Sequence, residues 1–116
     1  MRGDLAQARI EWEQILELFP EADEVPLAAL AIAGSFELQG QVRKAHDAYA
    51  RIEQQYGPSR VAVEARIGRA RMLEAFDDLD AAEAIYLECL AYSYNRDAVG
   101  TRLRALRARR NRRGGN

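Results

Sequence analysis

A chain of 116 residues with 48% hydrophobic and 30% charged residues is long enough to bury a core and is not a disordered segment. Its single cysteine, Cys89, excludes an internal disulfide and a zinc site built from several cysteines. The net charge of −1 hides an uneven distribution, because residues 1–101 hold all 18 acidic side chains, whereas residues 102–116 hold seven arginines and no acid. No apolar run approaches the ~20 residues of a membrane helix, and the N-terminus shows no apolar signal segment. We therefore expect a cytoplasmic protein, or a periplasmic one if the sequence is part of an exported chain.

The first two predicted helices are separated by an acidic loop. Apolar residues three and four positions apart indicate a helix over residues 3–19, and Pro20 ends it. Pro26 suits the first turn of a second helix over residues 26–39, and Gly40 suits its end. The expected packing stripes are Leu5, Ala8, Trp12, Ile15, Leu16 and Phe19 on the first helix, and Ala29, Ile32, Ala33 and Phe36 on the second.

Two further helices lie on either side of a turn at residues 57–59. The third is expected over residues 41–56 and the fourth over residues 60–76. Arg66 and Arg69 interrupt the apolar face of the fourth helix, so its pattern is weaker. Its expected buried residues are Ala62, Ala65, Ala70, Leu73 and Phe76.

The fifth predicted helix, residues 78–93, is apolar nearly all round, so another element must cover it. Asp77 or Asp78 is expected to cap its first turn. Residues 97–110 can form the covering helix, and residues 111–116 lack periodicity and are expected to fray. The apolar seam of the covering helix is Val99, Leu103 and Leu106.

One pattern occurs three times along the chain at a constant spacing of 37 residues. In each copy an alanine is followed four positions later by an aromatic residue and seven positions later by an apolar residue. A period of this length predicts an array of helical repeats. The equivalent positions are Ala8, Ala45 and Ala82; Trp12, Tyr49 and Tyr86; and Ile15, Ile52 and Cys89.

This pattern resembles the tetratricopeptide repeat family, whose helix-turn-helix unit combines small residues with an aromatic residue and a closing proline. The first copy has only the second half of the unit, and the third copy departs from the pattern at Arg66 and Arg69. The period and the linkers look most like bacterial arrays such as the periplasmic TolA-binding coordinator proteins. The matching residues are Ala8, Trp12 and Pro20 in the first copy; Ala29, Ile32, Ala33, Phe36, Ala45, Tyr49 and Pro58 in the second; and Ala70, Leu73, Ala82 and Tyr86 in the third.

The resemblance implies an all-α solenoid in a single domain, residues 1–110, with a half repeat over 3–19, repeats over 26–56 and 60–93, and a capping helix over 97–110. It also implies a non-catalytic scaffold that binds a peptide or a partner protein along its concave surface, without a cofactor or a metal. The alternative is that these positions are ordinary solvated helix faces. The residues expected to line the concave surface are Leu27, Leu30, Gly34, Glu37 and Leu38 on the second helix, and Glu64, Ile67, Arg71 and Glu74 on the fourth.

A second candidate site is the basic tail, which comprises Arg102, Arg104, Arg107, Arg109, Arg110, Arg112 and Arg113. A cluster of this kind attracts phosphate or acidic surfaces, so the alternative function is an electrostatic tether to nucleic acid or an acidic membrane. No aromatic residue interleaves with these arginines, which argues against base stacking. The tail can equally be the solvated face of a capping helix, whose C-terminal end favours positive charge.

The first helix has no preceding helix in the sequence to pair with. Trp12 and Ile15 are therefore expected to lie partly exposed on its outer side. Exposed apolar surface on a terminal repeat favours self-association, so we expect a homo-oligomer that forms through this half repeat.

Three further features have structural explanations. His46 stands beside Asp47, but neighbouring residues of a helix point about 100° apart and no nucleophile motif lies near them. Cys89 takes the place of an isoleucine in the repeat and is expected to be buried and unreactive. One acidic cluster lacks the glycine and the final glutamate of a calcium-binding loop, so helix capping explains it better: Asp77, Asp78 and Asp80.

Overall fold

The computed structural model describes residues 2–91 and 96–114, and every regular element in those ranges is an α-helix. The helices begin and end within a residue or two of the predicted bounds, except at the ends of the last two. In chain order they are α1 (Arg2–Leu18), α2 (Val25–Leu38), α3 (Val42–Tyr56), α4 (Arg60–Ala75), α5 (Leu79–Cys89) and α6 (Arg96–Gly114).

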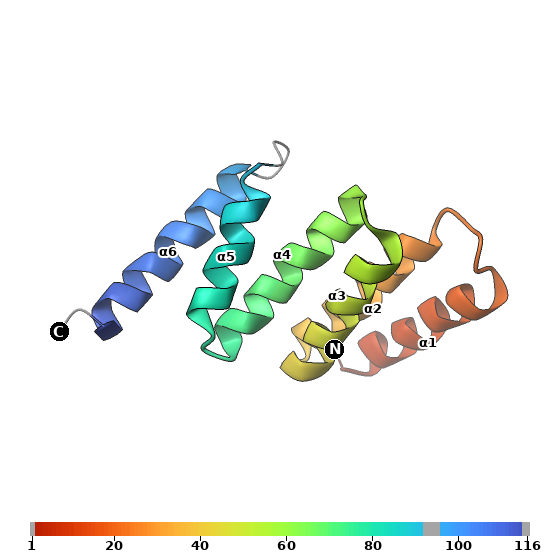
Figure 1. Cartoon of the computed structure of the whole chain (residues 1–116). Coiled ribbons are helices and arrows are strands. Elements are labelled where there is room, and N and C mark those ends of the chain that lie inside the picture. The colour runs from red at the N-terminus through yellow and green to blue at the C-terminus, as the bar shows by residue number, and fades with distance from the viewer. Residues whose placement is uncertain (1, 92–95, 115–116) are drawn as a thin grey trace.

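The helices stack one after another along a molecule that measures 53 × 31 × 20 Å. Each helix contacts the next one in the chain, and α2 also contacts α4. As Figure 1 shows, α1 and α6 lie at opposite ends of this row. The buried apolar side chains form two clusters, one shared by α2, α3 and α4 and the other by α4, α5 and α6. α4 therefore links two neighbouring cores.

The chain reverses direction at positions that the sequence marks. Gly40 adopts a φ of +73°, the left-handed conformation that glycine takes without strain, just after α2. The side chain of Ser59 accepts a hydrogen bond from the backbone N–H of Ala62 at 3.1 Å and caps α4. Asp78 accepts from the N–H of Ala81 at 3.3 Å and caps α5. Of the two caps predicted for α5, Asp78 therefore makes the bond.

Equivalent positions of the second and third copies are equally buried. Ala45 and Ala82 are completely inaccessible to solvent, and so are Ala33 and Ala70 on the helices that precede them. Small residues at these positions let neighbouring helices approach closely. In the first copy the same positions, Ala8, Trp12 and Ile15, are only half-buried.

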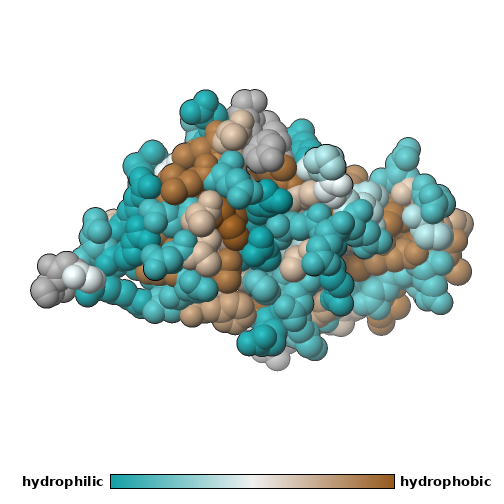
Figure 2. All heavy atoms as spheres, viewed as in Figure 1, coloured by the Kyte–Doolittle hydropathy of each residue, from teal (hydrophilic) through white to brown (hydrophobic). Residues whose placement is uncertain are grey.

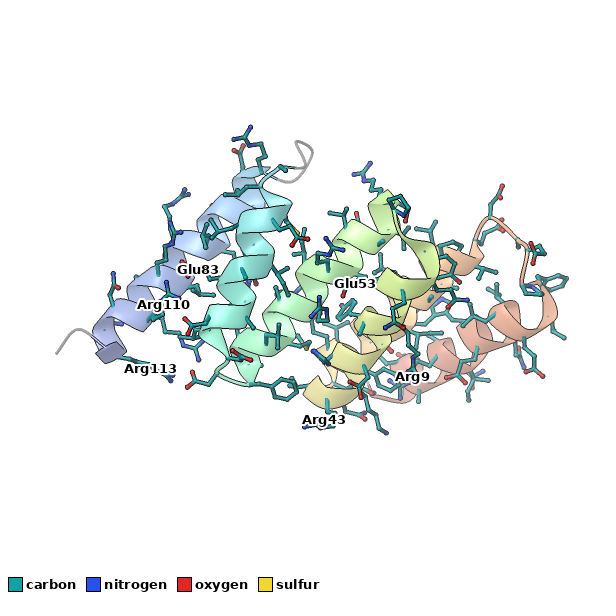
Figure 3. The ribbon with its side chains drawn as sticks, in the orientation of Figure 1. Arg9, Arg43, Glu53, Glu83, Arg110 and Arg113 are labelled. Atoms are coloured by element: carbon teal, nitrogen blue, oxygen red, sulfur yellow. The ribbon has the colours of Figure 1, made fainter. Side chains whose placement is uncertain are left out.

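Ion pairs join successive helices and explain why the apolar face of α4 is interrupted. Arg66 donates from Nε to Oε1 of Glu53 at 3.1 Å, and Arg69 donates from Nη2 to the same oxygen at 3.0 Å. Glu53 lies on α3 and is mostly buried (Figure 3). Arg66 also pairs with Glu88 on α5, so this arginine connects three helices.

Several predictions about helix ends were wrong. Phe19 and Phe76, which extend the apolar stripes of α1 and α4, are 60% and 42% exposed because they lie just beyond the last helical turn. α6 continues to Gly114, so residues 111–114, which were expected to fray, are helical. α5 ends at Cys89, and residues 92 and 93 of its predicted end lie outside the described ranges. Apolar surface remains uncovered at the α1 end of the molecule, where Figure 2 shows brown atoms.

Candidate functional site

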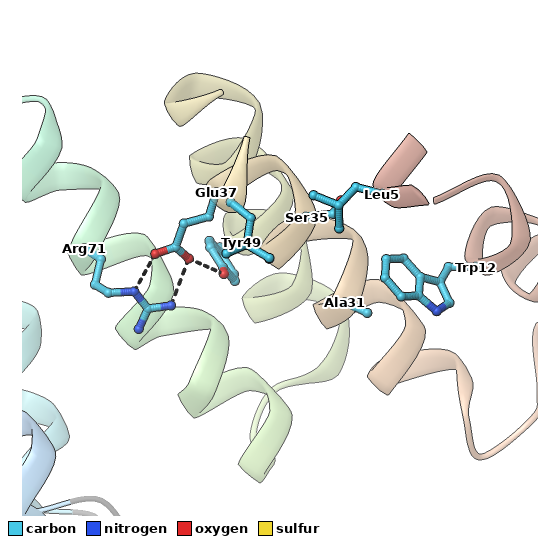
Figure 4. Close-up of a pocket in the computed structure, with 9 residues that line it drawn as sticks. Leu5, Trp12, Ala31, Ser35, Glu37, Tyr49 and Arg71 are labelled. Carbon is cyan, nitrogen blue, oxygen red and sulfur yellow. Dashed lines mark hydrogen bonds and ion pairs between the residues drawn. The ribbon is translucent and has the colours of Figure 1, made fainter. Parts of the chain in front are cut away.

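A hollow of about 490 Å³ opens between α1, α2 and α4. A neighbouring hollow of about 270 Å³ is lined by Leu30, Tyr49, Glu64, Ile67 and Arg71, and it shares Tyr49 and Arg71 with the first. We call these two hollows together the groove. Apolar side chains line most of the larger hollow, and polar ones gather at one end of it (Figure 4). The larger hollow is lined by Leu5, Trp12, Ala31, Gly34, Ser35, Glu37, Leu38, Tyr49 and Arg71.

Three side chains from three helices meet at the polar end of the groove. Arg71 of α4 binds the Glu37 carboxylate of α2 with both nitrogens of a fork, Nε to Oε2 at 2.8 Å and Nη2 to Oε1 at 3.0 Å. The hydroxyl of Tyr49, from α3, donates to Oε1 of Glu37 at 2.7 Å. A bidentate pair with a third hydrogen bond fixes the position of each group.

Burial and hydrogen bonding act in opposite directions on the Glu37 carboxyl. Burial alone would raise its pKa, but the hydrogen bonds from Arg71 and Tyr49 favour the charged form, and the net effect lowers the pKa. Burial, followed by the bond to Glu37, raises the pKa of Tyr49. The bond to Glu37 is the main cause that raises the pKa of Arg71. The groove thus presents a fixed carboxylate beside a fixed guanidinium.

The same kind of network recurs 37 residues further along the chain. Tyr86 donates to Oε2 of Glu74, as Tyr49 does to Glu37. Arg102 of α6 donates from Nε to the same Glu74 oxygen at 3.1 Å and to the Tyr86 hydroxyl at 2.9 Å. The glutamate and the tyrosine of the two networks therefore keep the 37-residue spacing of the repeat. The arginine does not keep this spacing, and in each network it comes from the helix after the one that carries the tyrosine.

The predicted groove residues fall into three groups. The first group lines the hollows: Leu30, Gly34, Glu37, Leu38, Glu64 and Arg71. Ile67 also lines the smaller hollow, and because it is only 7% exposed most of its side chain packs in the core. Glu74 serves the second network with Tyr86 and Arg102. Leu27 is 60% exposed and lines neither hollow.

The groove also contains residues that the sequence analysis did not assign to it. Tyr49 appears in the sequence analysis only as a position of the repeated pattern, yet it lines both hollows, as Arg71 does. Leu5, Trp12 and Ser35 also line the larger hollow. The sequence signal that could have indicated these residues is the repeat, in which Tyr49 and Trp12 occupy equivalent positions. Both line the larger hollow. A further hollow of about 410 Å³ lies at the α3–α4 turn and was not anticipated.

The basic tail lies against acidic side chains of α4, α5 and the turn between them. Most of its arginines form ion pairs there, and Figure 3 shows Arg110 near Glu83. Arg104 donates to the Thr101 hydroxyl at 3.2 Å, and Arg112 is exposed. Hydrogen bonds from these arginines, chiefly Arg113 and Arg107 respectively, lower the pKa values of Asp77 and Glu83. The pairs are Arg102–Glu74 (3.1 Å), Arg107–Glu83 (2.7 Å), Arg109–Asp77 (2.9 Å), Arg110–Asp80 (2.8 Å), Arg110–Glu83 (2.6 Å) and Arg113–Asp77.

The remaining candidates have structural surroundings. Nδ1 of His46 lies 3.1 Å from Oδ1 of Asp47, so the expectation that these neighbours point apart was wrong. The His46 ring stands edge-on to Phe76, and neither hollow of the groove includes it. Cys89 is completely buried, as predicted, and burial raises the pKa of its thiol.

None of the helices in residues 2–91 and 96–114 combines the length and apolar character needed to cross a membrane. Over the same ranges, no cluster of three or more His, Cys, Asp or Glu side chains has a geometry suited to a metal ion.

Comparisons with known proteins place no constraint on the family. No family model matches the sequence, and no curated protein matches it significantly.

Proposed function

We propose that this chain is a non-catalytic protein–protein interaction module, a tetratricopeptide-like solenoid that holds a peptide segment of its partner in the groove. The repeated architecture is supported by the serial packing of the helices and by the equal burial of Ala45 and Ala82. The repeated Glu–Tyr pairs at 37 and 49, and at 74 and 86, support it further. In such an array one helix of each pair lines the inner surface, and here α2 and α4 take that position.

The single observation that carries the binding proposal is the position of the Glu37–Arg71 pair beside apolar walls. Trp12 and Leu38 line a hollow large enough for an apolar side chain of a peptide. The guanidinium of Arg71 has five N–H donors, and the Glu37 pair uses two of them, which leaves donors for peptide carbonyls. The groove thus combines an apolar anchor site with fixed polar groups that set the direction of the bound segment.

Selection from a displayed peptide library, with the whole chain as bait, tests this proposal. We expect binders that share an apolar anchor and lose affinity for a Leu38→Glu variant. Leu38 is 77% exposed, so this change adds charge to the rim of the groove without removing core packing. Leu87→Glu is the matched control, because Leu87 on α5 is 45% exposed and lines neither hollow. Binders that ignore Leu38→Glu, or a library that yields none, would count against the groove.

The electrostatic tether is less well supported than the groove. Its arginines already face acidic partners within the chain, with Arg110 held by Asp80 and Glu83. A cation that is neutralised in this way releases fewer counterions from a phosphate backbone. We expect weak binding to RNA, DNA and anionic vesicles, and a shallow dependence of that binding on salt. A steep loss of tight binding between low and physiological salt would favour the tether instead.

A further inference from the structure

The charged side chains that line the groove do not balance. Among the described residues around its two hollows, the charged ones are Glu37, Glu64 and Arg71, so the lining has two carboxylates and one guanidinium. The Glu37 carboxylate accepts two hydrogen bonds from Arg71 and one from Tyr49. That pair is neutral as a unit, and Glu64 remains as the net negative charge of the groove.

The Glu64 carboxylate makes a weak ion pair within its own helix. Nε of Arg60, one turn earlier on α4, lies 3.8 Å from Oε1 of Glu64, which is too long for a hydrogen bond. The side chain of Arg60 is 71% exposed, and it lines neither hollow. Exposed ion pairs of this kind contribute little, because water screens them and both side chains lose freedom in forming them. A cation inside the groove can therefore compete with Arg60 for this carboxylate.

Aliphatic side chains lead from the polar end of the groove to Glu64. Leu30 of α2 and Ile67 of α4 occupy equivalent positions of the 37-residue repeat, and both line the smaller hollow. Glu64 and Arg71 line the same hollow and stand seven residues apart on one helix, a rise of about 10 Å. The smaller hollow is thus an apolar passage with a fixed guanidinium at one end and a carboxylate at the other.

A lysine or arginine side chain has the chemistry that this passage requires. Its methylene stem packs along apolar surface while its head carries the charge. A bond between a charged head and a carboxylate is also stronger than one between neutral groups. An acidic side chain in the same place would bring a like charge to Glu64, and a purely apolar one would bury the carboxylate without a partner.

We infer that the segment held in the groove carries a basic residue at a fixed distance from its apolar anchor residue. The anchor occupies the larger hollow, where Trp12 lies on the side away from Arg71 (Figure 4). The basic side chain occupies the smaller hollow, with its stem along the aliphatic walls and its head at Glu64. The hollows share Tyr49 and Arg71, which fixes the spacing of the two side chains. This specificity rests on the proposed binding of a peptide in the groove and adds the chemistry of that peptide.

Selection from a displayed library of random peptides, with the whole chain as bait, is the first measurement. We expect the selected peptides to share an apolar residue and a lysine or arginine at a constant spacing. Peptides that share the apolar residue and lack a basic one would overturn the basic-residue specificity and still support the groove. Peptides enriched in acidic residues would overturn it too, because the charged contact would then lie with the remaining donors of Arg71. A library that yields no binder would overturn both proposals.

Paired changes in the protein and in one selected peptide test the contact itself. Glu64→Gln should weaken binding, measured by fluorescence anisotropy, about tenfold. Replacing the basic residue of the peptide with glutamine should weaken it by the same factor. Both changes together should weaken it little more than either alone, since they remove the same contact. Two factors that multiply would show that the groups do not meet, and the specificity would be refuted.

Reversal of the charge at position 64 gives the most specific result. Glu64→Lys should weaken binding of the selected peptide by about a hundredfold, because like charges would then meet in the groove. The same variant should recover affinity for a peptide whose basic residue is replaced with glutamate. If Glu64→Lys binds the acidic peptide no better than the basic one, Glu64 does not contact that residue of the segment.

Glu17→Gln is the matched control for the loss of one negative charge. Glu17 is exposed on α1 and lines neither hollow, so this variant should bind the selected peptide like the unchanged chain. An equal loss of affinity in Glu17→Gln and Glu64→Gln would mean that net charge alone attracts the peptide, and the contact at Glu64 would be refuted. Circular dichroism of each variant shows whether its helices are kept.

Discussion

α1 and α3 carry the same stripe of residues at the same spacing, yet the stripe is core in one helix and partly surface in the other. Ala45 and Tyr49 of α3 are buried, whereas Ala8 and Trp12 of α1 are only half-buried. α3 packs between α2 and α4, and α1 packs mainly on α2. The difference shows that in a serial array the burial of a residue is decided by how many neighbouring helices cover it.

This comparison has a direct thermodynamic consequence. When each repeat contacts only its neighbours, stability is approximately a sum of repeat and interface terms. A substitution in α1 should therefore remove fewer interactions than the same substitution 37 or 74 residues later. Matched pairs of variants at equivalent positions measure that difference within one protein.

The largest expected loss is at the aromatic position of the third copy, which is compared with the equivalent position of the first. Tyr86 is completely buried and its hydroxyl contacts Glu74 and Arg102, so Tyr86→Ala should lower the free energy of unfolding by about 4 kcal/mol. Trp12→Ala removes a half-buried ring and should cost about 1–2 kcal/mol. Urea unfolding followed by circular dichroism gives both values. Equal losses would mean that α1 is as well covered as α5.

A smaller loss in the buried copy is expected when the alanines of the repeated pattern, Ala8 and Ala45, are enlarged. Ala45 is inaccessible and lies in the same cluster as Ala33, so Ala45→Leu should push α2 and α3 apart and cost about 3 kcal/mol. Ala8→Leu adds the same atoms to a half-open site and should change stability by less than about 0.5 kcal/mol. The shift in urea midpoint of each variant relative to the unchanged chain measures the effect. A large loss for Ala8→Leu would contradict the comparison.

Much of this arrangement can be predicted from the sequence because its determinants are local. Pro20, Gly40 and Asp78 mark helix boundaries through the backbone conformations and capping bonds that they favour. The 37-residue spacing predicts which alanines are inaccessible, since equivalent positions in a repeat have equivalent neighbours. Ala45 and Ala82 follow that rule.

The charged contacts could not be predicted in the same way, because they join helices whose crossing geometry a single-helix pattern does not contain. Arg66 and Arg69 interrupt an apolar stripe when α4 is considered alone, and only the position of Glu53 on α3 explains them. The arginines of α6 likewise found partners on the α4–α5 turn, as Arg109 does with Asp77. Periodicity predicted which positions are equivalent and did not predict which polar groups meet.

Two glycines on α2 and α4 allow a more exact test of local packing. A Cβ at Gly68 would lie 2.6 Å from the Tyr49 ring, whereas a Cβ at Gly34 would lie 3.8 Å from the Tyr49 hydroxyl. Alanine is favoured over glycine inside a helix by about 1 kcal/mol. Gly34→Ala should therefore stabilise the protein by about 0.5–1 kcal/mol. Gly68→Ala should instead destabilise it by about 1–2 kcal/mol, since overpacking against the ring outweighs the helix preference.

Thermal unfolding of both glycine variants checks the sign as well as the size of the effect. Opposite shifts in melting temperature are expected. If Gly68→Ala also raised the melting temperature, the Tyr49 ring would have to move away from α4 at little cost. Its hydrogen bond to Glu37 would then not be holding it in place.

A pH-dependent effect is expected at Glu37, which pairs with Arg71 and Tyr49 at the polar end of the groove. The folded state lowers the pKa of Glu37 below its ordinary value of 4.5, so the charged form stabilises the fold above that pH. As the pH falls through the lowered pKa, the carboxyl is protonated in the folded state too and this contribution is lost. Glu37→Gln should therefore cost about 1 kcal/mol at pH 7, given the partial exposure of the pair, and much less at pH 3.

Measuring the urea midpoint of Glu37→Gln and of the unchanged chain between pH 3 and pH 7 tests this linkage. The two curves should converge as the pH decreases, because the unchanged chain loses the ion pair that the variant never had. Glu64→Gln is a suitable control, since Glu64 lines the groove and its carboxylate approaches Arg60 only at 3.8 Å on the surface. A constant difference across the pH range would show that Glu37 acts by its shape and hydrogen bonds, and that its charge contributes nothing to the stability of α2 against α4.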